Sequence, residues 1–135
     1  MRVVLDASVA LKWVLDEPES DAALALRGED LIAPALWLAE AANALWRRSR
    51  IGDITADDAR TRLSELLNGP IASLAMEPYL GEALRLATET GHPVYDCTYL
   101  AVALRHDTHV VTADKRFASA ADREGLAGRV QLLTA

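Results

Sequence analysis

Cysteine is almost missing from this 135-residue sequence, in which Cys97 stands alone. A single cysteine excludes an internal disulfide, and without a cluster of Cys and His residues the sequence offers no site for a soft metal. Chains without disulfides are typical of a reducing cytoplasm, which is where we expect this protein.

Long apolar runs are also missing. No segment approaches the roughly 20 uninterrupted apolar residues that a membrane-spanning helix needs. Asp6 and Lys12 interrupt the apolar residues near position 1, and no small-residue cleavage site follows them, which argues against a signal peptide. We therefore expect neither a membrane span nor secretion.

Positive charge is in short supply. The sequence has 14 Lys and Arg residues against 20 Asp and Glu residues, a formal net charge of −6, which excludes holding nucleic acid by bulk charge. Lys12 and Lys115 are its only lysines, and the remaining bases are arginines, which suit bidentate contacts to phosphate. A nucleic-acid substrate would therefore have to be held locally. Glycine-rich phosphate loops are missing too, which argues against the common nucleotide-binding classes.

What is present favours one folded domain. Hydrophobic residues make up 51% of the sequence and charged residues 25%, so there is enough apolar surface for a core and no compositional sign of disorder. The length fits one domain of ordinary size, and we expect residues 1–135 to form it.

Strand-like and helix-like patterns alternate along the sequence. Short apolar runs predict strands at 2–5, 31–33, 71–75, 109–112 and 130–133. Helical spacing predicts helices at 8–15, with Ser8 as the N-cap, and at 18–27, 35–51, 55–68, 78–90, 95–105 and 114–124. This alternation with short connections favours an α/β fold, a parallel sheet covered by helices on both faces.

Four of the twenty carboxylates lie in or at the end of apolar stretches: Asp6, Glu40, Asp96 and Asp114. Asp6 and Asp114 each follow a strand, so both should lie at the carboxyl edge of a parallel sheet, where ligands bind in open α/β folds. Glu40 and Asp96 lie on helices that must pack against that sheet.

Charge repulsion makes such a cluster informative. Two carboxylates about 4 Å apart repel by about 4 kcal/mol at an effective dielectric constant of 20, and a divalent cation is the simplest compensation. Ligands that are all oxygens select Mg²⁺ or Mn²⁺ over zinc. Each acid taken alone has an ordinary alternative as a helix cap or surface residue, and Asp96 in a first helical turn is the clearest such case.

Four ordered motifs carry a family resemblance. They are DAS at 6–8, LAEAANAL at 38–45, YDCTYLAVA at 95–103 and VTADKRF at 111–117. Together they resemble a PIN-domain nuclease, and in particular a VapC-type toxin of a bacterial or archaeal toxin–antitoxin pair. The resemblance spans nearly the whole chain. Cys97 is a minor departure, because small residues are common at that position in the family.

The resemblance implies a three-layer sandwich with a central parallel sheet of about four to five strands. It implies metal-dependent endoribonuclease activity that leaves a 5′-phosphate and a 3′-hydroxyl. The metal is expected to be Mg²⁺, or alternatively Mn²⁺, held by Asp6, Glu40 and Asp96, with Asp114 as a further ligand, directly or through water. It further implies a homodimer and a small VapB-type antitoxin as partner.

Residues near these acids are candidates for supporting roles. The hydroxyls of Ser8 and Thr112 could support a carboxylate or a metal-bound water, although Ser8 is equally well explained as a helix N-cap. Asn43 lies three residues beyond Glu40 and could orient it. The candidates for contacts to RNA phosphate are Arg47, Lys12, Lys115 and Arg116. For Arg47 the alternative is that basic residues favour the C-terminal end of a helix.

Other residues have structural interpretations. Trp13, Trp37 and Trp46 are expected to pack in the core or an interface rather than to stack on bases, and Cys97 to be a small buried apolar residue. His92, His106 and His109 share no ligand spacing and receive no catalytic role.

The main alternative function is a PIN-fold interaction module that binds an antitoxin or RNA without cleaving it, in which we would expect the acids to be depleted. A receiver-like or phosphatase-like domain is less favoured. A two-aspartate phosphatase needs an acid where this chain has Ser8.

Overall fold

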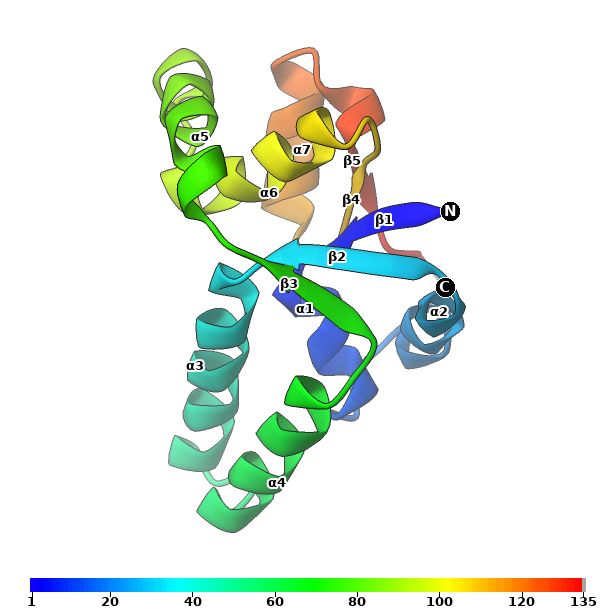
Figure 1. Cartoon of the computed structure of the whole chain (residues 1–135). Coiled ribbons are helices and arrows are strands. Elements are labelled where there is room, and N and C mark those ends of the chain that lie inside the picture. Colours follow the sequence, from blue (N-terminus) through cyan, green and yellow to red (C-terminus); the bar gives the residue numbers. More distant parts are fainter. Residues whose placement is uncertain (135) are drawn as a thin grey trace.

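The computed structural model describes residues 1–134 and has one five-stranded sheet at its centre (Figure 1). The strands are β1 (Arg2–Leu5), β2 (Asp30–Pro34), β3 (Ile71–Leu74), β4 (Val110–Thr112) and β5 (Val130–Leu132). Their order in the sheet is β3-β2-β1-β4-β5, and every neighbouring pair is parallel. The predicted parallel sheet is therefore confirmed, with β1 in the middle.

Helices follow the strands as the sequence predicts. The α-helices are α1 (Ala7–Ala10), α2 (Ser20–Ala25), α3 (Leu36–Arg50), α4 (Ala56–Leu67), α5 (Glu77–Thr90), α6 (Val94–Arg105) and α7 (Lys115–Arg123). Three 3-10 turns complete the structure: η1 (Leu11–Trp13), η2 (Leu26–Gly28) and η3 (Ala127–Arg129).

The helices form a layer on each side of the sheet. In Figure 1, α1, α3 and α4 lie below the sheet, and α5, α6 and α7 lie above it. This division follows from the strand order. The connections β1 to β2 to β3 run one way across the sheet, whereas the return from β3 to β4 and on to β5 runs the other way, and right-handed crossovers then place their helices on opposite faces. The expected three-layer α/β sandwich is confirmed.

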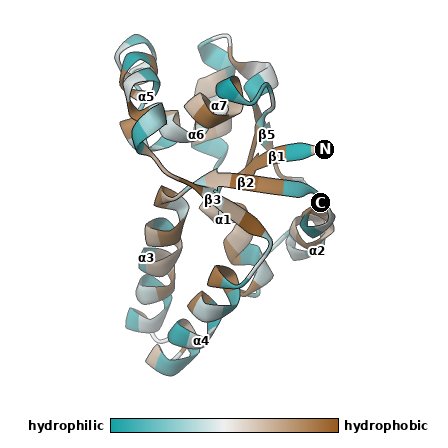
Figure 2. Ribbon diagram, viewed as in Figure 1, coloured by the Kyte–Doolittle hydropathy of each residue, from teal (hydrophilic) through white to brown (hydrophobic). Residues whose placement is uncertain are grey.

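Helix α6 lies in the core against the sheet. All residues from Cys97 to Ala103 are buried, which explains why this helix is apolar all round, and Val4 and Leu5 of β1 are fully buried beneath it. Figure 2 shows the strands brown along most of their length, with teal at the outer ends of β1 and β2. Cys97 is fully buried, as predicted.

The first helix differs from the prediction. A single helix over 8–15 with Ser8 as its N-cap was expected, but α1 begins at Ala7 and continues only as the 3-10 turn η1. Asp6 holds the N-cap position, and no side chain caps the helix. The reason is that the Ser8 hydroxyl bonds to the carboxylate of Asp6 instead of to the helix backbone.

The three tryptophans are placed differently from one another. Trp13 is partly buried against the core, and its indole N–H donates to the backbone carbonyl of Ala23 at 2.8 Å. Trp37 is buried, and its indole N–H donates to the Ser73 hydroxyl at 2.8 Å, which joins α3 to β3. Trp46 is 52% exposed and therefore does not belong to the core. Within residues 1–134, no helix is both long and apolar enough to cross a membrane.

Candidate functional site

Asp6 lies at the end of the central strand, where β1 leads into α1. Its side chain is only 9% exposed, and its Oδ2 accepts hydrogen bonds from the Ser8 hydroxyl at 2.5 Å and from the Thr112 hydroxyl at 2.8 Å. Hydrogen bonds of this kind stabilise the charged form of a carboxylate. The carboxylate in the middle of the sheet edge is therefore held in place from both sides.

Ser8 and Thr112 also bind the connection between β4 and α7. The Ser8 oxygen accepts from the backbone N–H of Ala113 at 3.0 Å, and the Thr112 oxygen accepts from the backbone N–H of Asp114 at 3.0 Å. Each hydroxyl thus donates to Asp6 and accepts from the backbone of the neighbouring connection. This chain of bonds fixes the position of Asp114 relative to Asp6.

Glu40 reaches the same edge from the first half of α3, and its orientation depends on Tyr99. The fully buried Tyr99 donates its hydroxyl proton to Oε1 of Glu40 at 2.6 Å. The prediction that Asn43 orients Glu40 is wrong. Asn43 is exposed, and in the described part of the chain it makes no hydrogen bond to Glu40.

Asp96 and Asp114 complete the set. Asp96 lies in the first turn of α6 and is partly buried. Asp114 is the N-cap of α7, where its Oδ1 accepts from the backbone N–H groups of Arg116 and Phe117 at 2.9 and 3.4 Å. Both bonds go to Oδ1, and within residues 1–134 the second oxygen of Asp114 accepts no hydrogen bond.

Burial and mutual repulsion raise the pKa values of these carboxyls. Burial raises the pKa of Asp6, and Asp114 adds to the rise. Burial, together with the charges of Asp6 and Asp96, raises the pKa of Glu40 to about 7. Burial and the charges of Asp6 and Asp114 raise the pKa of Asp96 to about 6, whereas His92 acts to lower it. The four acids therefore act on one another electrostatically.

Basic side chains do not neutralise the cluster. In residues 1–134, none of the four carboxylates forms an ion pair with Lys or Arg. An all-oxygen donor set with uncompensated negative charge fits Mg²⁺ or Mn²⁺. The carboxylates are not arranged as a closed chelate, however. Among the described residues no group of three or more His, Cys, Asp or Glu side chains is close enough to hold an ion as it stands.

Lys12 is not available for RNA phosphate. It is buried, its ammonium donates to the backbone carbonyl of Pro18 at 2.8 Å, and it lies 3.8 and 3.6 Å from the carboxylates of Glu17 and Glu19. A buried ammonium needs such partners because its desolvation is costly. The prediction that Lys12 contacts RNA phosphate is therefore wrong, because the loop after η1 already binds its ammonium.

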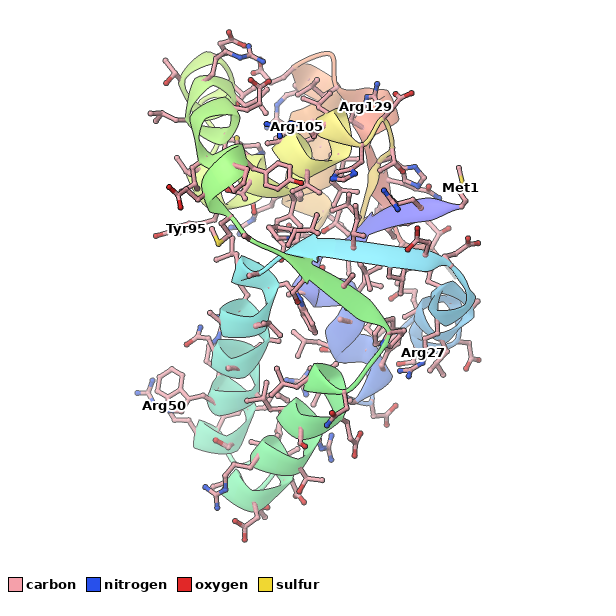
Figure 3. All side chains as sticks on the ribbon, viewed as in Figure 1. Met1, Arg27, Arg50, Tyr95, Arg105 and Arg129 are labelled. Atoms are coloured by element: carbon pink, nitrogen blue, oxygen red, sulfur yellow. The ribbon has the colours of Figure 1, made fainter. Side chains whose placement is uncertain are left out.

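The other three basic candidates remain exposed. Lys115 and Arg116 begin α7 directly after Asp114, beside the acids. Arg47 is seven residues beyond Glu40, which on a helix is a separation of about 10 Å along the axis. It lies towards the end of α3 that is marked by Arg50 in Figure 3, away from the sheet.

Two residues of the site were not predicted from the sequence. Tyr99 carried one usable signal, because a tyrosine within a wholly apolar helix needs a partner for its hydroxyl. His92 precedes Asp96 by four residues, but its position relative to that carboxylate depends on the bend at residues 91–93 between α5 and α6.

Comparison with known proteins identifies relatives over most of the chain. Residues 3–123 match the family model described as the PIN domain. Two curated proteins of Pyrobaculum aerophilum are similar. One, named Ribonuclease VapC3, is 32% identical over 123 residues, which is 87% of this chain and 93% of the relative. The other, named Exonuclease VapC9, is 34% identical over 87 residues, 64% of either protein.

Two solved structures share the fold. The crystal structure of PAE2754 from Pyrobaculum aerophilum matches 96% of this chain and 83% of its own, with a TM-score of 0.73 and 28% identity. VapBC2 from Rickettsia felis, bound to a DNA fragment from their promoter, matches 99% of this chain and all of its own, with a TM-score of 0.68. Its identity of 14% makes it a likeness of fold alone.

Proposed function

This chain belongs to the PIN-domain family, and from that premise we propose that it is a nuclease that hydrolyses RNA phosphodiesters with a divalent cation. One observation carries the proposal: Asp6, Glu40, Asp96 and Asp114 act on one another at the carboxyl edge of the sheet, and no basic side chain in the described part of the chain pairs with any of them. The names of the curated relatives, a ribonuclease and an exonuclease, support the same class of reaction.

The four carboxylates would hold Mg²⁺ or Mn²⁺, which supplies a Lewis acid for the attacking water and for the charge that develops on the phosphate. The chain's own groups prepare that site. Ser8 and Thr112 hold the carboxylate of Asp6 by hydrogen bonds, and Tyr99 holds that of Glu40. Burial of Asp6 keeps competing water away from the carboxylate. The products of this reaction would be a 5′-phosphate and a 3′-hydroxyl.

Substitution of a site carboxylate tests the proposal. Asp96→Asn should abolish RNA cleavage and weaken Mn²⁺ binding measured by calorimetry, while the protein stays folded. Asp122→Asn is the matched control, because Asp122 is an exposed residue of α7 outside the cluster. EDTA should stop cleavage, and Mg²⁺ or Mn²⁺ should restore it. Full activity in EDTA, or in Asp96→Asn, would overturn the metal-dependent reaction.

RNA binding without cleavage in the presence of Mn²⁺ would instead support the non-cleaving interaction module.

We propose that the protein acts as the toxin of a toxin–antitoxin pair, with a small VapB-type protein as its partner. The VapC names of both curated relatives support this role. Expression of the chain should arrest growth, and co-expression of a small reading frame next to its gene should relieve the arrest. Expression of Asp96→Asn should not arrest growth, and arrest by that variant would separate toxicity from nuclease activity.

We also propose a homodimer. Leu80 and Leu84 on α5 are 39% and 60% exposed. Tyr95 at the start of α6, labelled in Figure 3, is 63% exposed. Exposed apolar side chains grouped on neighbouring elements favour an interface. Sedimentation should show a dimer that Leu84→Glu dissociates and Leu67→Glu, at a 56% exposed leucine of α4 across the sheet, does not. A monomer at all concentrations would contradict this.

A further inference from the structure

A cavity of about 440 Å³ opens beside the acidic cluster, between α7 and the connection from α5 to α6. It is lined by His92, Lys115, Arg116, Ser119, Ala120 and Arg123. Three of these six residues are basic and no carboxylate is among them, although the chain as a whole carries a net charge of −6. The cavity is therefore a local concentration of positive charge in an acidic protein.

The basic lining follows from the face that α7 presents. Arg116, Ser119, Ala120 and Arg123 are spaced three, four and seven residues apart, so they share one side of the helix. Phe117 and Ala121 lie on an adjoining side of the helix and are buried. Within the described residues, Lys115, Arg116 and Arg123 make no ion pair with any acid. Their charges are thus available to a ligand.

His92 provides an independent sign of a ligand. Its Nε2 atom is buried and, in the part of the chain that the structure describes, has no hydrogen-bond partner. The ring packs edge-on against Phe117, with ring centroids 6.0 Å apart, so its position is fixed. Buried polar atoms in folded proteins nearly always have a partner, and an exception calls for an explanation. An acceptor bound in the cavity would supply that partner.

The cavity adjoins the acidic cluster on two elements. Asp96 follows His92 by four residues, and His92 acts on the charge of Asp96. Asp114 directly precedes Lys115 and caps α7 with its own side chain, so the N–H groups of that helix end are already in use. A ligand of the cavity would therefore be held by side chains and would lie next to the site of cleavage.

We propose that this cavity is a phosphate subsite, which holds the RNA backbone phosphate next to the one that is cleaved. The inference rests on the proposed nuclease function. His92 donates from Nε2 to a phosphate oxygen, Ser119 donates its hydroxyl proton, and Lys115, Arg116 and Arg123 neutralise the charge. The subsite thereby places the RNA chain so that the adjoining phosphodiester reaches the carboxylates.

RNA binding without cleavage tests the subsite. The parent protein is Asp6→Asn, assayed in EDTA with a fluorescent single-stranded RNA oligonucleotide by anisotropy at several salt concentrations. Three variants are made in this parent: Arg123→Gln, Lys115→Gln and His92→Phe, the last of which keeps an aromatic ring against Phe117. Arg60→Gln is the matched control, because it removes the same charge from an exposed position on α4, across the sheet.

Arg123→Gln and Lys115→Gln should each weaken binding about tenfold, as expected when a charge-assisted hydrogen bond is removed. The slope of log affinity against log salt should fall by about 0.7 for each phosphate that the variant no longer neutralises. His92→Phe should weaken binding without lowering the melting temperature, since it removes an unpartnered buried nitrogen. Arg60→Gln should leave the affinity and the slope within error of the parent.

Unchanged affinity and salt slope in Arg123→Gln and Lys115→Gln would overturn the subsite, as would an equal weakening in Arg60→Gln. Inorganic phosphate is titrated alone as well. Binding of inorganic phosphate as tight as that of RNA would make the cavity a free-anion site and would also overturn the inference. Cleavage by the unmodified protein is measured in parallel, so that a wrong subsite is distinguished from a wrong nuclease assignment.

Discussion

Tyr99 is the side chain through which the protein sets the charge of Glu40. Its hydroxyl, 2.6 Å from Oε1, acts to lower the pKa of Glu40 against the stronger effect of burial. In Tyr99→Phe the pKa of Glu40 should therefore rise above about 7. NMR titration of the Glu40 carboxyl in the protein without a divalent cation should show this rise. Stability should fall by about 1 kcal/mol through loss of the hydrogen bond.

Tyr95→Phe is the control for this change, because Tyr95 is an exposed tyrosine of the same helix. An unshifted titration of Glu40 in Tyr99→Phe without a divalent cation would mean that Tyr99 only packs.

The raised pKa values of Glu40 and Asp96 predict how stability depends on pH without a divalent cation. The folded-state pKa values of about 7 and about 6 exceed the ordinary values of 4.5 and 3.8, so the folded chain binds protons more tightly than the unfolded chain. The free energy of unfolding should therefore fall as the pH rises from about 4 to about 8. Urea unfolding across this range measures the effect.

Glu40→Gln should remove part of this loss and stabilise the protein at pH 8 by about 1 kcal/mol, less than the full shift implies because the carboxyl is partly exposed. The variant should bring no gain at pH 4, where Glu40 is already protonated. Glu65→Gln, on the exposed side of α4, serves as the control. Stability that rises with pH over this range would contradict the burial of uncompensated acids.

At the scale of elements, α4 depends on its first turn. The Thr55 hydroxyl accepts from the backbone N–H of Asp58 at 3.0 Å, and the Asp58 carboxylate accepts from the backbone N–H of Thr55 at 3.2 Å. Thr55→Ala breaks this capping box and should cost about 1 kcal/mol of unfolding free energy, measured in urea. Thr61→Ala, at an exposed position inside the same helix, should cost less. Equal losses would show that the cap does not stabilise α4.

Secondary-structure elements could be predicted well from the sequence, because strand and helix patterns are separated by clear stops. Gly91, in the left-handed conformation at φ 73°, ends α5 as expected, and Pro93 precedes α6. The prediction failed at α1, where a hydroxyl had two possible partners. Local sequence indicates that Ser8 can cap a helix or bond to Asp6 two residues before it, but only the fold brings Thr112 and Ala113 within its reach.

At the scale of the molecule, the sheet should not open uniformly. β1 is central, and Val3, Val4 and Leu5 are buried, whereas β3 is an edge strand with only partly buried or exposed residues. Native-state hydrogen exchange should therefore show the amides of β3 exchanging well before those of β1. Exchange of β1 as early as β3 would mean that the sheet opens only as a whole.

The acids of the site could be predicted because topology alone brings them together. Asp6 and Asp114 follow parallel strands that are neighbours in the sheet, and Glu40 and Asp96 lie on helices that pack on its two faces. The partners of Tyr99, His92 and Lys12 could not be predicted. Each depends on side-chain directions that are decided by packing between segments distant in sequence, such as the 59 residues that separate Tyr99 from Glu40.

The bond between Thr112 and Asp6 joins residues 106 positions apart and so has a consequence for biosynthesis. A ribosome makes the first carboxylate almost at once, but it must translate past position 112 before the hydroxyl that holds this carboxylate exists. Nascent or prematurely released polypeptides that stop short of this point contain at most three of the four acids, without the strand that aligns them. A cell that translates this message therefore meets a complete site only in polypeptides that extend beyond residue 112.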